Sequence, residues 1–118
     1  MTVEFSAGRV SPGELFSCTA HICNPSAEMT ATPFVAMLDI GISEYWFYPS
    51  WAHWPPGFDY TALDLPTGIT DEAVVPEFLW PDTGTDTLGG ITIWGTLLNN
   101  EMTELRGSLG SDTFGYGP

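Results

Sequence analysis

The chain contains no lysine, and its only basic side chains besides two histidines are those of Arg9 and Arg106. They are opposed by 15 aspartates and glutamates, so the formal net charge at pH 7 is −13. A surface of that sign repels phosphate groups, which argues against nucleic acids and anionic membranes as partners. Long apolar runs are also missing, since no stretch reaches the roughly 18 residues typical of a membrane-spanning helix. We therefore expect no nucleic-acid binding and no membrane insertion.

Cysteine is scarce, and the two that are present are Cys18 and Cys23. The segment around them, Glu14–Cys23, alternates between two sets of residues as a β-strand does. An extended strand would separate the two Cα atoms by roughly 16 Å, whereas a disulfide needs them within about 7 Å. A continuous strand and a Cys18–Cys23 disulfide therefore exclude each other. We favour the strand, with Cys18 as a small core residue, over a local or intermolecular disulfide, and we expect neither cysteine to be catalytic.

A secretory signal is missing from the start of the chain, because residues 1–13 have neither a basic region nor an apolar one. Either the protein is cytosolic or a signal segment was removed before this numbering begins. The lack of lysine, the many threonines and the Gly, Pro and Trp content are typical of secreted β proteins. We therefore expect an extracellular or cell-surface protein.

Helical spacing is absent as well, because no stretch of ten or more residues shows it without an interrupting Pro or Gly. Turn residues instead separate short segments that are predicted as strands: Val3–Ser6, Glu14–Cys23, Phe34–Ile40, Glu44–Tyr48, Tyr60–Leu63, Ala73–Leu79, Ile91–Leu98 and Leu105–Tyr116. Seven or eight such strands predict one all-β domain over residues 1–118, an antiparallel β-sandwich of the immunoglobulin-like kind. Residues 1–8 form its N-terminal strand or arm.

The alternation within these strands predicts which side chains form the core: Phe16, Ala20, Ile22, Phe34, Leu38, Ile40, Phe78, Ile91 and Ile93. Gly95 lies on the same face as Ile91 and Ile93, and it predicts a gap that a large aromatic side chain could fill. Pro76 cannot donate a hydrogen bond to a neighbouring strand, so its segment is predicted at a sheet edge or a bulge.

The densest feature is the aromatic segment, residues 45–60, which reads YWFYPSWAHWPPGFDY. Exposed aromatic rings stack on sugars and anchor protein interfaces, while buried ones belong to the core or cover the open end of a sandwich. The sequence leaves these three interpretations open. The candidate interface or sugar-stacking residues are Trp46, Tyr48, Trp51 and Trp54, together with Val3 and Phe5 of the N-terminal strand.

Patterns for metal binding and catalysis are weak or missing. The run from Asp82 to Asp86 and the pair Asp71-Glu72 offer carboxylates for Ca²⁺, but the run lacks the remaining ligands of a helix–loop–helix calcium site, so a solvated turn is predicted. His21 and His53 have no zinc-ligand spacing. No Gly-x-Ser-x-Gly motif is present. We expect no enzyme, no metal site and no cofactor.

Several segments together resemble immunoglobulin-like modules near the C-termini of large, poorly characterised bacterial surface and secreted proteins. These segments are Asn24-Pro25, Phe34–Ile40, Tyr45–Trp51, Phe78–Pro81, Gly90–Leu98, Thr103–Gly107 and Phe114–Tyr116. The resemblance runs from about Glu14 to Tyr116, and Tyr45–Trp51 is its strongest part. It implies an extracellular β-sandwich used for adhesion, attachment or assembly, and it brings no catalytic residues.

Two classes of function remain. The first is an extracellular structural protein, a homo-oligomer or polymer whose copies assemble into a filament, sheath or surface layer. In this hypothesis Met1–Gly8 and Trp46–Trp54 lie in contacts between copies, although Met1–Gly8 could equally pair within its own domain. The second class is an extracellular carbohydrate-binding or adhesion module that uses the aromatic segment. The net charge opposes self-association unless salt or divalent cations screen it.

Overall fold

The structure is a computed structural model that describes all residues, 1–118, and every regular element in it is a strand. None of its elements is a helix suited to crossing a membrane. The strands are β1 (Thr2–Phe5), β2 (Arg9–Val10), β3 (Leu15–Asn24), β4 (Thr30–Asp39), β5 (Tyr45–Phe47), β6 (Ala52–Trp54), β7 (Thr61–Leu65), β8 (Gly68–Leu79), β9 (Leu88–Leu98) and β10 (Leu105–Tyr116).

All eight predicted strand segments overlap strands of the structure. The two strands that were not predicted, β2 and β6, have only 2 and 3 residues. So short a segment cannot display the alternation from which strands are predicted. The structure therefore has ten strands where seven or eight were expected.

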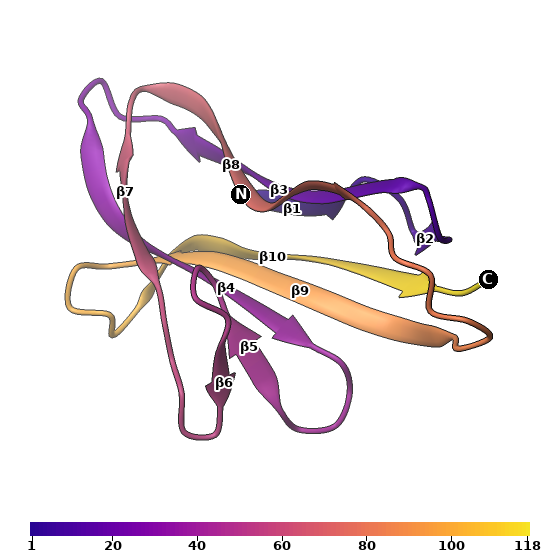
Figure 1. The fold of residues 1–118 in the computed structure, drawn as a ribbon. Helices are drawn as coiled ribbons and strands as arrows, with labels where there is room; N and C mark the ends of the chain where they lie inside the picture. Colours follow the sequence, from indigo (N-terminus) through magenta and orange to yellow (C-terminus); the bar gives the residue numbers. More distant parts are fainter.

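The strands form two sheets that face each other (Figure 1). The small sheet has three strands in the order β1-β3-β8, and the large sheet has seven, in the order β2-β10-β9-β4-β5-β6 with β7 paired to β4. Every pair is antiparallel except β2 and β10, which run parallel. A short hairpin makes its two strands antiparallel. Because β2 and β10 lie at opposite ends of the chain, nothing local fixes their relative direction.

One cluster of 14 buried hydrophobic residues lies between the sheets. Six of the nine predicted core residues belong to it: Phe16, Ala20, Ile22, Phe34, Ile91 and Ile93. The prediction was wrong for Phe78, which is 39% exposed and lies near the end of β8, where it lines an open cleft. Leu38 and Ile40 are half-buried and pack against the margin of the cluster.

The N-terminal strand β1 pairs with β3 of its own chain and packs against the large sheet. There, Gly95 of β9 and Gly110 of β10 lie opposite each other. A Cβ on Gly95 would lie 2.5 Å from Val3 Cγ2, and one on Gly110 would lie 3.3 Å from the Val3 backbone nitrogen. The two glycines thus form a notch that receives Val3. The predicted gap at Gly95 is filled by this smaller side chain rather than by an aromatic ring.

Both cysteines lie on the continuous strand β3, which confirms the strand alternative. They are free, with Cys18 buried and Cys23 exposed. Burial raises the pKa of the Cys18 thiol to about 12, and the nearby charges of Asp112 and Glu4 act in the same direction. At neutral pH the Cys18 side chain is therefore a protonated core group.

Candidate functional site

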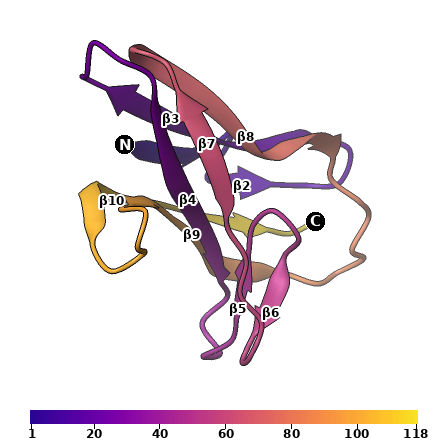
Figure 2. The same ribbon diagram turned by 90° about the vertical axis from the view of Figure 1, so that its left-hand side faces the viewer.

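The large sheet is wider than the small sheet that covers it, and its last two strands, β5 and β6, project beyond the cover (Figures 1 and 2). Side chains opposite each other on paired strands lie on the same face. Leu38 of β4 lies opposite Ile93 on one side and Trp46 on the other, and Trp46 lies opposite His53. This row begins on the core-facing side at Ile93, which is 0% exposed, and ends at the exposed His53.

The uncovered end of this row forms an open depression, which we call the overhang. It has a volume of about 320 Å³ and is lined by Leu38, Ile40, Trp46 and Trp51. The indole of Trp46 stacks on the imidazole of His53, with ring centroids 4.9 Å apart and planes inclined by 22°. No polar residue belongs to the lining, so the overhang offers apolar contact and few hydrogen bonds.

A second apolar space adjoins the overhang. This inner cleft has a volume of about 250 Å³ and shares Leu38 and Trp51 with it. Its other lining residues come from both sheets and from the segment after β8: Phe5, Phe16, Val75, Phe78, Trp80 and Phe114. Apolar surface therefore continues from the overhang toward the core.

Trp51 lies where the two spaces meet, in a strained backbone conformation. Its φ is 59°, in the left-handed region that a bulky residue rarely adopts. Such a conformation costs on the order of 1–3 kcal/mol and persists only where surrounding contacts hold it, which is often the case at functional sites. Here the ring of Tyr48 packs edge-on against Trp51 at 5.9 Å.

Strands β5 and β6 form a hairpin. Tyr48, predicted as a binding residue, instead connects this hairpin to the small sheet. Its hydroxyl donates to Glu72 Oε1 of β8 at 2.7 Å, and its ring packs edge-on against Phe34. Partial burial, followed by the hydrogen bond to Glu72 and its charge, raises the pKa of Tyr48 to about 12. The phenol is therefore committed to an internal contact, and we assign it a positioning role.

The opposite face of the hairpin is covered by residues that follow it in the chain. Phe47 is buried and packs against Phe58 at 4.7 Å between ring centroids. The Asp59 carboxylate fastens this cover to the hairpin turn, because it accepts from the Ser50 N–H at 3.0 Å. Hydrogen bonds from the Ser50 hydroxyl, the Ser50 N–H and the Tyr60 N–H lower the pKa of Asp59.

The remaining candidates divide clearly. Trp54 is 43% exposed and available to a partner. Val3 and Phe5, in contrast, are 4% and 7% exposed and belong to the chain's own core. In this chain β1 uses the two side chains to close its own sandwich, so they present little surface to a second copy. The sequence could not decide between the two pairings, since a strand adds equally well to its own sheet or to another's edge.

The run from Asp82 to Asp86 forms a turn, whereas Asp71 and Glu72 lie on strand β8. The Asp82 carboxylate accepts from the Gly84 N–H at 2.8 Å, and the Thr83 carbonyl accepts from the Asp86 N–H at 3.3 Å. No group of three or more His, Cys, Asp or Glu side chains is placed to hold a metal ion.

Sequence reasoning missed Leu38 and Ile40 as lining residues of a surface. Their alternation signals burial, and only the different widths of the two sheets leave them uncovered.

No family model matches this sequence, and no curated protein matches it either. The geometry of the overhang is therefore the main guide to function.

Proposed function

We propose that the protein is an extracellular structural subunit, an antiparallel immunoglobulin-like β-sandwich whose copies associate through the overhang. The single observation that carries the proposal is the wholly apolar lining of that depression. Apolar side chains of a second copy would bury surface there. Each Å² of apolar surface removed from water would stabilise the contact by about 25 cal/mol. Trp54 and Ile42, which are 43% and 56% exposed, are suitable side chains on the same hairpin and the loop before it.

A protein surface suits the overhang better than a sugar does. A sugar ring stacks on an aromatic face, but its hydroxyls also need hydrogen-bond partners when they lose water, and an unpaired buried polar group costs roughly 1–3 kcal/mol. The four lining residues offer only the indole N–H groups of Trp46 and Trp51 as donors and no side-chain acceptor. The carbohydrate-binding alternative therefore has less support than self-association.

The extracellular location and the assembly role rest on composition and on the resemblance to bacterial surface modules. A filament, sheath or surface layer requires repeated contacts between copies and no catalytic residue. The net charge of −13 opposes such contacts, so association should strengthen when salt or a divalent cation screens the charge.

Sedimentation velocity at about 20 mM and about 500 mM NaCl tests the proposal, because the screening length falls several-fold over this range. We expect larger species at high salt for the wild type and for Ile69→Ala, a matched control that removes a 75% exposed side chain from β8. Trp46→Ala, shown by circular dichroism to be folded, should remain monomeric. A wild type that is monomeric throughout, or a Trp46→Ala variant that associates equally, would contradict the proposal. Binding of a monomeric wild type to a polysaccharide would favour the carbohydrate alternative.

A further inference from the structure

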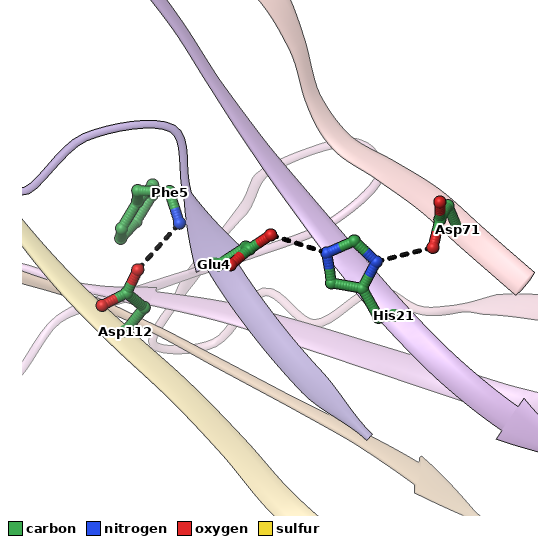
Figure 3. A network of polar contacts seen from close by, with 5 residues as sticks. All are labelled: Glu4, Phe5, His21, Asp71 and Asp112. Atoms are coloured by element: carbon green, nitrogen blue, oxygen red, sulfur yellow. Dashed lines mark hydrogen bonds and ion pairs between the residues drawn. The ribbon is translucent and has the colours of Figure 1, made fainter. Parts of the chain in front are cut away.

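Three titratable side chains, one from each strand of the small sheet, form a row on its outer face (Figure 3). His21 of β3 lies in the middle. Its Nδ1 is 2.6 Å from Asp71 Oδ1 of β8, and its Nε2 is 2.8 Å from Glu4 Oε1 of β1. The imidazole thus connects the two edge strands across the central one.

This geometry suits only one protonation state of the ring. Both imidazole nitrogens face a carboxylate oxygen, and only the imidazolium has two N–H groups to donate. The hydrogen bond to Asp71, followed by the one to Glu4, raises the pKa of His21. The neutral ring has one N–H, and it would leave one carboxylate facing a nitrogen lone pair.

Few polar side chains hold β1 in place, so the contact between Glu4 and His21 matters to it. Only 4 residues of β1 pair with β3. On the strand's other side, the Phe5 N–H donates to Asp112 Oδ2 of β10 at 2.8 Å, and Val3 lies in the glycine notch. Glu4 is the side chain through which β1 contacts His21.

We propose that His21 is a proton-dependent latch on β1: the imidazolium fastens β1 to β3 and β8, and its deprotonation loosens β1 while the large sheet stays paired. The latch holds fully at a pH below the ordinary histidine pKa, and it is lost as the pH rises through the higher pKa of the folded state. The protein is thereby most firmly closed in mildly acidic solution.

Several titratable groups lie around His21. Glu4 faces it from β1 and Asp71 from β8. Cys23 on the same strand and Met1, with its amino group, line a shallow depression beside the ring. Glu72 and Asp112 are engaged elsewhere, with Tyr48 and with the Phe5 N–H. Neither arginine forms an ion pair at this site, because the ion pairs of the structure all involve histidine.

Amide hydrogen exchange followed by NMR at about pH 6 and about pH 8.5 tests the latch, with protection factors corrected for the intrinsic pH dependence of exchange. Protection of the β1 amides should fall roughly two- to fivefold between these values, the range that a surface ion pair provides. Amides paired between β4 and β9 should keep their protection. His21→Gln should remove the pH response of β1, whereas His53→Gln, which alters a contact to Glu44 on the other sheet, should leave it intact.

A Cys23→Ser variant controls for the neighbouring thiol and should respond as the wild type does. Imidazole ¹⁵N shifts of His21 provide a second readout, and at about pH 6 they should report protons on both nitrogens. The proposal is overturned if β1 protection in the wild type is the same at both pH values, or if His21→Gln retains the response.

Discussion

The contact between Val3 and Gly95 sets how closely β1 approaches the large sheet. Because a Cβ on Gly95 would lie 2.5 Å from Val3 Cγ2, alanine at this position forces the side chain or the strand to move. We predict that Gly95→Ala lowers the free energy of unfolding by about 1–3 kcal/mol, the usual effect of overpacking a core. Urea denaturation followed by tryptophan fluorescence measures the change.

Gly89→Ala provides the matched control, since Gly89 lies on the same strand and no atom lies within 4 Å of its added Cβ. Its effect should stay within about 0.5 kcal/mol. In a double-mutant cycle, Val3→Ala should be less harmful when Gly95 is already alanine, because the smaller side chain removes the clash. Equal stability of Gly95→Ala and the wild type would show that the notch does not hold Val3.

Ile93 and Leu38 follow the same sequence pattern but differ in burial. Ile93 and Leu38 were both predicted as core, but Ile93 is 0% exposed while Leu38 is half-buried at the overhang. Ile93→Ala should cost roughly 2–5 kcal/mol of stability, and Leu38→Ala should cost clearly less. Thermal and urea unfolding of the two variants measure the difference. An equal loss at both positions would mean that Leu38 is covered as fully as Ile93.

The Asp112 side chain on β10 connects this strand to β1. Asp112→Ala leaves the partly buried Phe5 N–H without its acceptor, and we predict a loss of about 1–3 kcal/mol. Asp112→Asn keeps an acceptor oxygen and should lose less. Asp64→Ala, which removes the same charge from an exposed position on β7, controls for the change in net charge. A loss of equal size in Asp64→Ala would assign the effect to charge alone.

The sheet edges oppose assembly by strand addition. β8 carries Pro76 and several carboxylates, β2 and β6 are very short, and β1 is held by Asp112. Prolines, charges and short edge strands are common means of preventing edge-to-edge pairing. The association we propose therefore relies on side chains rather than on pairing at these edges.

The strands were largely predictable from the sequence, because the alternation of apolar and polar residues is a local pattern that can be recognised over five or more residues. The register of β1, the parallel direction of β2 and the position of Phe78 at an open edge were not. Each depends on a pairing between segments far apart in the chain. Propensity and periodicity carry no information about such a pairing.

At the scale of the whole molecule, little positive charge balances the net charge of −13. The ion pairs all involve a histidine, and neither arginine takes part in one. We predict that raising NaCl from about 20 mM to about 500 mM increases the melting temperature by a few degrees, because salt screens the repulsion within the folded chain. Calorimetry at constant pH and protein concentration measures the shift. A melting temperature that falls with salt would indicate that the attractive pairs outweigh the repulsion.

The aromatic segment was recognised from composition, but which of its rings are open was not predictable. Trp46 and Trp51 line the overhang only because the large sheet extends past the small one, whereas Tyr48 is fastened to Glu72. Sheet widths follow from the order in which ten strands pair. That order is a property of the complete fold.

The most direct test of association through the overhang uses the indole N–H signals of the five tryptophans. Two-dimensional ¹H–¹⁵N spectra recorded at low and high protein concentration, in about 500 mM NaCl to screen the charge, report which rings enter a contact. We expect the signals of Trp46, Trp51 and Trp54 to shift or broaden with concentration while those of Trp80 and Trp94 stay unchanged. Signals that all remain constant, or a change confined to Trp80 and Trp94, would contradict it.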